Sequence, residues 1–412
     1  MSKLDYLIRE LCPDGVEYKT IGELATDIYR GTGVKRTEVT DDGVPCVRYG
    51  EIYTKYGIWF DECVSHTREE FLSSPKYFEY GDILFAITGE SVEDISKSCA
   101  YVGNERCIAG GDIVVLKHQQ NPKYLSYALS TSDARMQKSK GKVKSKVVHA
   151  SIPSIKSIRI PVPPLEVQRE IVHILDGFTL LSAELSAELS ARKVQYEYYK
   201  NKLLDFSESD VPFMSVGELF DIRNGLSKEK AAFGHGKPII NFSDVYNKRY
   251  LEKKDVIGLV DVSDDEISRF SAQKGDVFFT RTSETKEDIG MSSTLVDDIK
   301  DCVFSGFVLR ARPKTNLLLP KFCAYFFSSD EVRKTIVRYA AVTTRATTTG
   351  PKLSKIMVPI ISIDKQKEIV DILDRFDVLC NDITKGIPAE IEARQKQYEY
   401  YRDKILAFKE AI

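Results

Sequence analysis

The sequence predicts a mixed α/β (α+β) protein in which two related globular units are joined by two long helices. Residues 165–178 return as residues 363–376, at an offset of 376 − 178 = 198, with 8 of 14 positions identical. Residues 191–206 return as residues 393–408, at an offset of 393 − 191 = 202, with 10 of 16 positions identical. Matches of this length within one chain indicate a duplicated architecture and therefore a pseudo-twofold internal repeat.

The composition is that of a globular protein with room for two or three domains. The chain has 412 residues, of which 42% are hydrophobic and 29% are charged. No apolar run approaches the roughly 18 residues that a membrane span requires, and the charged N-terminus lacks the apolar core of a signal peptide. We therefore expect a cytoplasmic protein. The net charge of −2 argues against a uniformly basic surface, so a nucleic-acid-binding surface would be local or completed by a partner.

The first globular unit is predicted to cover residues 1–164. It begins with a short helix that a Pro-Asp-Gly turn ends, continues in strand-like runs with a two-residue hydrophobic period, and closes at Pro163-Pro164. The expected elements are a helix at Lys3–Leu11, strands at Val44–Tyr49 and Asp82–Ile87, a helix at Pro122–Ser130 and a last strand at Ile155–Val162.

The repeated segments, residues 165–206 and 363–412, have the hydrophobic spacing of paired helices. Steps of three and four along each copy visit an almost unbroken apolar seam, which is the a/d rhythm of a coiled coil. The seam positions that we expect to pair the helices or dock another subunit are Leu175, Phe178, Leu185, Leu189, Tyr196, Tyr199, Leu373, Phe376, Tyr398 and Tyr401. Two separate amphipathic helices, each covering its own unit, are the alternative.

The two offsets differ by 202 − 198 = 4 residues, so the second copy contains a four-residue insertion. The seam then includes Ile383, Ile387 and Ile391, and Gly386 and Pro388 flank the insertion. Glycine weakens a helix interior and proline suits a first turn. The second helix is therefore predicted to break and restart near Pro388.

The second globular unit, residues 207–362, repeats the order of the first in diverged form. The shared positions are turn residues and apolar strand residues, and they pair Ile21–Leu24 with Val216–Leu219, Gly81–Phe85 with Gly275–Phe279, and Pro122–Tyr124 with Pro320–Phe322. The polar loops between them differ, notably Lys138–Lys146 against Val342–Thr349. One scaffold with two unlike sets of loops indicates two related domains that recognise different things.

Catalytic signatures are missing from the sequence. It contains no G-x-x-x-x-G-K-S/T phosphate loop, no Gly-rich turn with the spacing of a dinucleotide or S-adenosylmethionine site, no Asn-Pro-Pro-aromatic motif, no G-x-S-x-G elbow and no H-E-x-x-H helix. The eight cysteines form no C-x-x-C pair, so we expect buried reduced thiols and no metal site. His173 corresponds to Asp371 in the second copy and is interpreted as a solvated helix residue. The chain is predicted to be non-catalytic.

The strongest binding signal outside the repeat is an acid-free run of alternating lysines, Lys138, Lys140, Lys142, Lys144 and Lys146. In an extended conformation these side chains would share one edge, which suits contact with phosphates. A solvated loop is the alternative. Further basic, hydroxyl or amide side chains in the variable loops are candidate DNA contacts: Arg30, Lys35, Arg36, Arg223, Asn224, Asn241, Arg338, Thr343, Thr344 and Arg345.

The order of parts resembles the specificity subunits of type I restriction-modification systems. The resemblance rests on Q-x-E-I-V-x-I-L-D-x-F and Q-Y-E-Y-Y at both sites and on the I-G-E-L entry at Ile21, and it covers essentially the whole chain. It implies two target recognition domains, each reading one half of a split DNA sequence, and two helices packed as an antiparallel spacer. It also implies docking of two methyltransferase (modification) subunits, with restriction/translocase subunits completing the restriction enzyme.

The resemblance implies no catalytic residue in this chain, and it places S-adenosylmethionine, ATP and Mg²⁺ in the partner subunits. Two other readings compete with it. A coiled-coil scaffold with two modules could bind proteins instead of DNA, a possibility that the lysine run disfavours. A self-sufficient methyltransferase or nuclease lacks a cofactor motif in the sequence.

Overall fold

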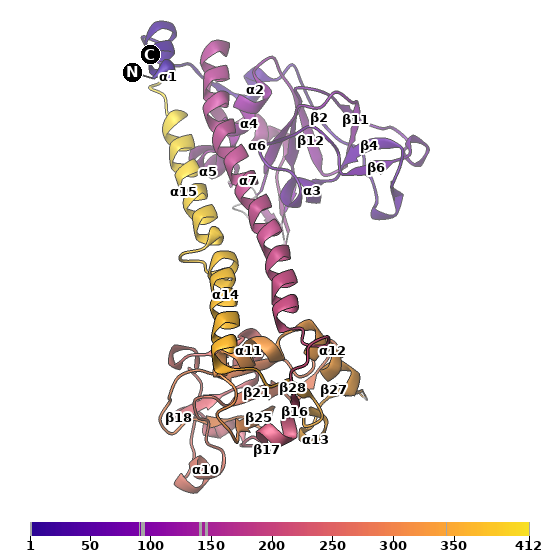
Figure 1. Ribbon diagram of the computed structural model, residues 1–412. Coiled ribbons are helices and arrows are strands. Elements are labelled where there is room, and N and C mark those ends of the chain that lie inside the picture. The colour runs from indigo at the N-terminus through magenta and orange to yellow at the C-terminus, as the bar shows by residue number, and fades with distance from the viewer. Residues whose placement is uncertain are drawn as a thin grey trace. The chain divides into compact units, whose positions relative to one another are not determined.

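The computed structural model describes residues 2–89, 91, 95–139, 142–144, 147–342 and 344–411 (Figure 1). The chain divides into two compact units, one made of Met1–Ser186 with Glu390–Ile412 and the other of Ala187–Ala389. Each unit therefore contains one globular part together with a segment from each of the two repeated helical regions.

The first unit combines short helices and strands with segments of two long helices. Its helices are α1 (Lys3–Leu11), α2 (Ile21–Leu24), α3 (Tyr49–Thr54), α4 (Pro122–Ser130), α5 (Ser132–Lys138), α6 (Ile152–Lys156), the first part of α7 (Leu165–Leu204) and most of α15 (Ile387–Ile405). Its strands are β1 (Tyr18–Thr20), β2 (Asp27–Arg30), β3 (Val39–Thr40), β4 (Val44–Val47), β5 (Trp59–Phe60), β6 (Ser65–Thr67), β7 (Tyr77–Phe78), β8 (Ile83–Ala86), β9 (Thr88–Gly89), β10 (Ser98–Tyr101), β11 (Cys107–Ala109), β12 (Ile113–Lys117), β13 (Lys142–Lys144), β14 (Val147–His149) and β15 (Arg159–Pro161).

The central sheet of the first unit has the strand order β2-β12-β8-β10-β5 and is buried on both faces. Ile83 and Phe85 of β8 face a core shared with α1, α4, α7 and α15. Leu84 and Ala86 face a second core that the sheet β3-β6-β4-β11-β7 closes. Because successive strand residues point to opposite faces, one apolar run supplies both cores.

The second unit contains the remaining elements. Its helices are the last part of α7, α8 (Val216–Leu219), α9 (Phe242–Asn247), α10 (Asp264–Arg269), α11 (Pro320–Phe327), α12 (Asp330–Tyr339), α13 (Gly350–Leu353) and α14 (Ile363–Asn381). Its strands are β16 (Phe213–Ser215), β17 (Phe220–Asn224), β18 (Phe233–Ile240), β19 (Tyr250–Leu251), β20 (Leu259–Val260), β21 (Val277–Thr280), β22 (Thr282–Ser283), β23 (Ser292–Leu295), β24 (Val303–Phe304), β25 (Val308–Pro313), β26 (Ala341–Val342), β27 (Ala346–Thr347) and β28 (Met357–Pro359).

The two units share the topology of their central sheet, whereas the second sheet has five strands in the first unit, β3-β6-β4-β11-β7, and three in the second, β20-β18-β24. The central sheet of the second unit runs β17-β25-β21-β23-β19, which matches the first sheet strand for strand. The outer pairs β1-β15 and β16-β28 also correspond, as do the small sheets β13-β14-β9 and β22-β27-β26. The predicted fold class, two related mixed units built on long helices, is confirmed.

The I-G-E-L motif and its counterpart form the same capped turn in both units. Thr20 accepts a hydrogen bond from the Glu23 backbone N–H at 3.2 Å, and Glu23 accepts one from the Thr20 backbone N–H at 2.7 Å. Ser215 and Glu218 repeat both bonds at 3.2 and 2.7 Å. This reciprocal capping box stabilises a helix too short to form alone, which explains why the motif survives in both copies.

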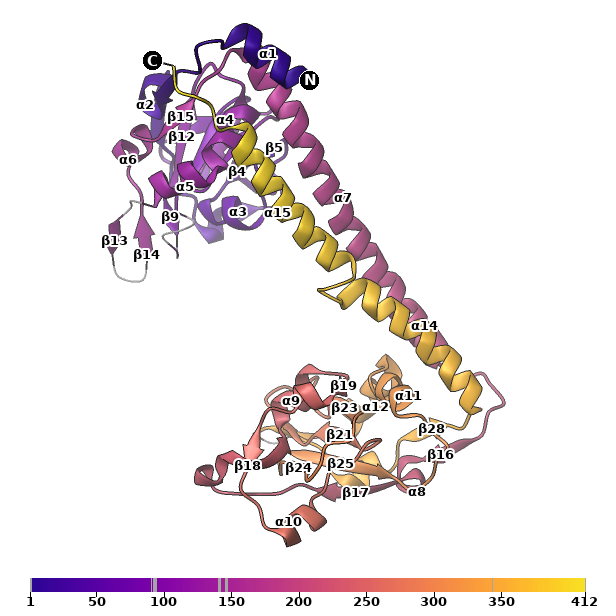
Figure 2. The ribbon, with the colours of Figure 1, turned by 90° about the vertical axis from the view of Figure 1, so that its left-hand side faces the viewer.

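Within each unit the two long-helix segments lie side by side and antiparallel (Figures 1 and 2). In the first unit, the Phe178 ring stacks on Tyr401 with centroids 5.7 Å apart. In the second, Phe376 stacks on Tyr196 at 6.1 Å and on Tyr199 at 5.8 Å. The segments predicted to form paired helices therefore pack against each other within each unit.

The predicted break in the second repeated segment is confirmed, because α14 ends at Asn381 and α15 begins at Ile387. The Gly386 N–H donates to the Asp382 carbonyl at 2.9 Å, and a Cβ on Gly386 would lie 2.3 Å from the Val378 carbonyl oxygen, so the turn requires glycine. Placing Ile383 in the apolar seam was wrong. Ile383 lies in this turn and is 73% exposed.

The last strand of the first unit was also predicted incorrectly. Residues Ile152–Lys156 form helix α6, and the strand is limited to Arg159–Pro161. Ser151 caps this helix by accepting a hydrogen bond from the Ser154 N–H at 3.3 Å, and Pro153 lies in its first turn. The capping serine and the proline outweigh the strand propensity of the isoleucines. Among the described residues, no helix combines the length and apolar character needed to cross a membrane.

Candidate nucleic-acid interface

A small sheet in each unit carries the loops that differ most between the two copies. In the first unit, β14 pairs antiparallel with β13 and with β9, and Figure 2 shows β13 and β14 projecting from the body of that unit. In the second unit, β27 pairs in the same way with β26 and β22. The scaffold thus presents two hairpins of unrelated sequence at equivalent places.

The lysine run lies partly in this hairpin and partly outside it. Lys142 and Lys144 belong to β13, but their side chains, like all of Lys140 and Lys146, lie outside the described residues. For Lys138, the structure corrects the prediction. It ends helix α5 and is 8% exposed, and its Nζ donates to Ser98 Oγ at 3.0 Å. The expectation that it continues an extended, solvent-facing edge was wrong, because the Thr131-capped helix runs through it and turns it inward.

We expect Lys142→Ala/Lys144→Ala to weaken binding to all duplex sequences about equally, if both side chains contact phosphates. Each lost contact reduces the slope of log K against log salt by about 0.9, so the pair removes roughly two units. The measurement is duplex affinity over a salt series. Lys365→Ala/Lys367→Ala removes the same charge from exposed positions on α14 and serves as the control. An unchanged slope would indicate that the lysine run is a solvated loop. A changed sequence preference would indicate that the run contacts base edges.

The equivalent region of the second unit presents exposed basic and polar side chains. Arg338 is exposed on α12, and Thr344 and Arg345 are exposed in the turn between β26 and β27. In the described part of the chain, Arg338 and Arg345 have no ion-pair partner and the Thr344 hydroxyl has no hydrogen-bond partner. Thr343 lies outside the described residues. The three described side chains are therefore free to contact a ligand.

Three other predicted DNA contacts are exposed and form ion pairs with carboxylates of the same chain. Arg30 pairs with Asp112 at 2.6 Å, Lys35 with Glu38 at 3.2 Å, and Arg223 with Asp221 at 2.8 Å. Pairs as exposed as these contribute little, so the cations can exchange partners. Arg36 and Asn224 are exposed. Half-buried Asn241 precedes α9, where its backbone N–H donates to the Asp244 carboxylate at 2.8 Å.

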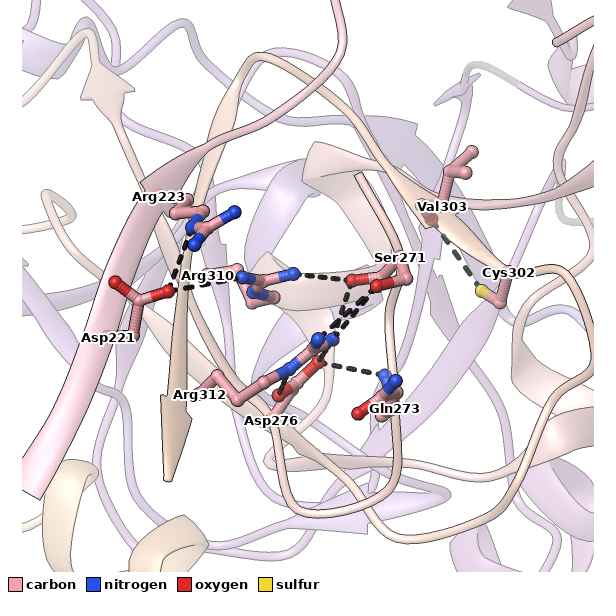
Figure 3. Close-up of polar contacts among 9 residues, drawn as sticks. All are labelled: Asp221, Arg223, Ser271, Gln273, Asp276, Cys302, Val303, Arg310 and Arg312. Carbon is pink, nitrogen blue, oxygen red and sulfur yellow. Dashed lines mark hydrogen bonds and ion pairs between the residues drawn. The ribbon is translucent and has the colours of Figure 1, made fainter. Parts of the chain in front are cut away.

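Beneath Arg223 lies a buried polar network that the sequence reasoning missed (Figure 3). Arg312 makes a two-pronged contact with Asp276, Nε–Oδ1 at 2.9 Å and Nη2–Oδ2 at 2.8 Å. Arg310 is 2% exposed, donates from Nη1 to the Ser271 carbonyl at 2.7 Å, and lies 3.8 Å from Asp221. Burial lowers the pKa of Arg310. The network connects the edge strand β17, which carries Arg223, to the sheet interior.

Strand register relates this network to the first unit. Arg312 corresponds to Lys117, which pairs with Asp82 at 3.1 Å, as Arg312 pairs with Asp276. Arg310 corresponds to Val115, which is fully buried in an apolar core. Aligning the strand sequences IVVLK and VLRARP across the repeat would have singled out Arg310. The second unit is therefore more polar inside, directly behind one of its variable edges.

Two polar side chains that are identical in both repeats tie the long helices to the globular parts. Asp176 accepts from Lys123 Nζ at 2.7 Å, Tyr127 Oη at 2.7 Å and Trp59 Nε1 at 3.2 Å. Asp374, at the offset of 198, accepts from Lys321 at 2.7 Å and from Tyr325 at 2.6 Å.

Gln168 and Gln366 repeat a second tie. Each accepts a hydrogen bond from a backbone N–H in the segment before α4 or α11, at 3.0 and 2.7 Å. The identity of these polar residues in both copies was the signal for their role. They hold each globular part at a defined orientation to its own helix segment.

The helices also expose an aromatic surface. Tyr198 and Tyr199 form a T-shaped pair with centroids 5.3 Å apart, and Tyr400 and Tyr401 repeat the pair at the same distance. Tyr198 is 59% exposed and Tyr400 is 61% exposed. Of the other seam positions, Leu175, Leu373, Tyr196 and Tyr398 are buried, and Leu185 and Leu189 are half-buried. Exposed aromatic side chains at equivalent places suit contact with another protein.

The comparisons with known proteins agree on one family. The family model for the type I restriction modification DNA specificity domain matches residues 13–191 and 208–393. The type I restriction enzyme EcoR124I/EcoR124II specificity subunit of Escherichia coli is 34% identical over 269 residues, which cover 62% of this chain and 64% of that subunit. The chain thus spans less than two thirds of that relative's length in the match.

A second relative and a solved structure extend the likeness. The putative type I restriction enzyme specificity subunit S.HindORF215P of Haemophilus influenzae is 31% identical over 281 residues, covering 65% of this chain and 68% of its own. A chain solved in work on complex assembly and conformational transition of the type I R-M system has a TM-score of 0.68 at 16% identity. It covers 96% of this chain and 98% of its own length, and at this identity it shows the fold alone. With the DNA specificity domain matched in both halves, the chain belongs to the specificity subunits of type I restriction-modification systems.

Proposed function

We propose that this chain reads a bipartite DNA sequence for a type I restriction-modification complex, with each unit recognising one half of the target. The main support for this proposal is that the central-sheet topology occurs twice and presents hairpins of unrelated sequence at the same place. Duplex DNA has local twofold axes, so a pseudo-symmetric protein can address two half-sites, and different loops make those half-sites different.

The long helices have two roles in this proposal. They separate the two reading units and so set the unread gap between the half-sites. They also dock two methyltransferase subunits, and the exposed tyrosine pairs Tyr198–Tyr199 and Tyr400–Tyr401 are the docking surface that we assign. Because the pairs are repeated, two identical subunits can dock in equivalent ways.

The chain itself carries out no chemistry in this proposal. Methyl transfer belongs to the methyltransferase subunits, which bind S-adenosylmethionine, and ATP- and Mg²⁺-dependent translocation and cleavage belong to the restriction subunits. The sequence supports this division because it lacks the phosphate-loop and Gly-rich cofactor motifs. The complex acts on DNA in the cytoplasm.

The proposal is tested by duplex binding with and without methyltransferase subunits. We expect sequence-specific binding, and DNA methylation only in the assembled complex. If no assembly binds DNA sequence-specifically, and the two units stably bind a protein ligand, the result would support the protein-binding scaffold instead. Methyl transfer by the purified chain above a no-protein control would contradict the non-catalytic role.

Exchanging the first reading unit is expected to change one half of the target alone. Replacing residues 18–160 with the matching segment of another specificity subunit leaves α7, α14 and α15 in place. The methylome of a host carrying the hybrid should keep the half-site of the second unit and gain a new first half. A hybrid that alters both halves would show that the units do not read independently.

A further inference from the structure

A cavity of about 490 Å³ lies inside the first unit, where β10, α4 and α5 face segments of α7 and α15. The residues that matter most in its lining are Ser98, Arg135, Lys138, Thr179, Tyr398 and Arg402. Its volume is within the range of small-molecule sites. No carboxylate lines it among the described residues, although four cationic side chains do.

Lys138 is a buried cation of this cavity. Its side chain is 8% exposed, its Nζ donates to Ser98 Oγ at 3.0 Å, and the Phe85 ring centroid lies 5.7 Å away. No carboxylate within the described part of the chain pairs with it. A buried ammonium group without a counter-ion is unfavourable, so the site is poised to accept an anion.

Two further side chains at the cavity, Tyr398 and Arg402, also indicate that an anionic acceptor is missing. Tyr398 is 7% exposed, and its hydroxyl has no hydrogen-bond partner within the described part of the chain. Arg402 is 1% exposed and contacts Asp403 through Nε at 2.8 Å and Nη2 at 2.7 Å. Among the described residues, these two contacts engage only Nε and Nη2 of its guanidinium group. Buried donors normally have partners, so three side chains with spare donors around one cavity indicate a missing acceptor.

The second unit shows which kind of hydrogen-bond acceptor fits the cavity. There, residues of the chain itself occupy the equivalent place. Tyr398 corresponds to Tyr196 (398 − 202 = 196), whose hydroxyl lies 3.4 Å from the Asp377 carboxylate. Asp377 also pairs with Arg249 at 3.0 Å. The position of Asp377 is occupied in the first unit by Thr179, since 377 − 198 = 179. The first unit keeps the tyrosine and lacks the anion.

Lys138 itself distinguishes the two units in the same way. Its counterpart is Ile336, since 336 − 198 = 138, and Ile336 is 1% exposed in the apolar core of the second unit. Its methyl group would lie 2.5 Å from a Cβ built on Gly290, so this part of the second unit is closed. The first unit has exchanged an isoleucine for a lysine and a carboxylate for a threonine, and both exchanges favour an external anion.

We propose that this cavity binds a small molecule that carries a phosphate group, held by Lys138, Tyr398 and Arg402. A phosphate offers enough acceptor oxygens and charge for all three donors, whereas one carboxylate would leave donors unpaired. Ile58, Ile95 and Leu129 also line the cavity and can accept an apolar part of the ligand. Among the described residues, none of β13 or β14, the variable hairpin that we assign to DNA, lines the cavity.

Binding is coupled to the charge of Lys138. Burial, together with the nearby Arg135 charge, lowers the pKa of Lys138 to about 7, and Cys99 opposes this effect. The other titratable groups that line the cavity, among the described residues, are Tyr53, Lys97, Tyr398 and Arg402. Burial raises the pKa of Cys99 to about 12 and also raises that of Tyr398, so neither thiol nor phenol titrates near neutrality. An anion stabilises the charged ammonium, so its affinity falls as pH rises above about 7.

The test is calorimetric titration of the full chain, without DNA, with inorganic phosphate and with phenyl phosphate. Both should bind, and phenyl phosphate should bind more tightly than inorganic phosphate. The charge of sulfate is constant near neutrality, so a sulfate titration isolates the charge of the protein. Sulfate should bind more weakly at pH 8.5 than at pH 6.5. Lys138→Ile, which installs the residue of the second unit, should weaken binding at least about tenfold. Tyr398→Phe, which keeps the ring, should weaken it several-fold. Lys334→Met, at an exposed lysine of α12, should have no effect.

Failure of the wild-type chain to bind either phosphate at millimolar concentration would overturn the proposal, as would wild-type affinity in Lys138→Ile. If Lys138→Ile does not fold, Tyr398→Phe with unchanged affinity overturns it equally. Displacement of phenyl phosphate by duplex DNA of any sequence would mean that the cavity receives a DNA phosphate, which contradicts the small-molecule ligand. Since no DNA is present in the main titration, its outcome is independent of the proposed DNA-reading function.

Discussion

Inserting a third Ser-Ala-Glu-Leu tetrad after Leu189 is expected to lengthen the unread gap of the DNA target by one base pair and to leave both half-sites unchanged. The chain already contains two such tetrads, residues 182–185 and 186–189, in the continuous helix α7. The boundary between the compact units falls between Ser186 and Ala187, so the insertion lengthens the helix three residues beyond the point where the units meet in sequence.

The size of the effect follows from helix geometry. Four residues add about 6 Å and turn the far end by about 40°, because they exceed one turn of 3.6 residues. One base-pair step moves along DNA by roughly 3.4 Å and rotates by about 36°. The rotations match and the lengths match in part, so bending or tilt must absorb the difference. The turn at 382–386, between α14 and α15, is a place where the partner helix can adjust.

The measurement is the methylation pattern of a host that carries the insertion variant in an active complex. A matched control places the same tetrad after Ser209, in the segment between α7 and β16, where it adds residues without lengthening α7. The control should keep the wild-type gap. An active insertion variant with an unchanged gap would show that these helices do not set the spacing.

Replacing Asp176 with leucine is expected to destabilise the first unit and abolish reading of its half-site. The carboxylate accepts hydrogen bonds from Lys123, Tyr127 and Trp59. Removal leaves three donors without their acceptor, and the side chains of Asp176 and Lys123 are only 20% and 24% exposed. Allowing for this partial solvation, we expect a loss of about 2–3 kcal/mol in the free energy of unfolding.

Denaturant unfolding of the full chain measures this loss, and methylome sequencing measures its effect on the target. Asp374→Leu should destabilise the second unit and affect the other half-site, because Asp374 repeats the contacts with Lys321 and Tyr325. His173→Leu changes an exposed residue of the same helix and should leave stability within about 0.5 kcal/mol of wild type. Equal stability of Asp176→Leu and His173→Leu would contradict a supporting role for the carboxylate.

The sequence by itself determined the parts that depend on local pattern and on repetition. Two copies of one helix motif, with offsets that differ by four residues, predicted both the duplication and the break near Pro388, and α15 begins at Ile387. Apolar period and proline or glycine position are properties of a few consecutive residues, so they can be identified without knowledge of the fold. The missing catalytic motifs are local signals of the same kind.

Only the tertiary structure decided which polar side chains are buried and with which partners. Lys138 looked like the first member of an exposed lysine row, yet the helix that ends at it turns its ammonium group toward Ser98. Arg310 looked like an ordinary strand residue, yet it lies in the interior behind β17. Burial of a long charged side chain depends on the elements packed around it, which come from distant parts of the sequence, and adjacent residues do not encode it.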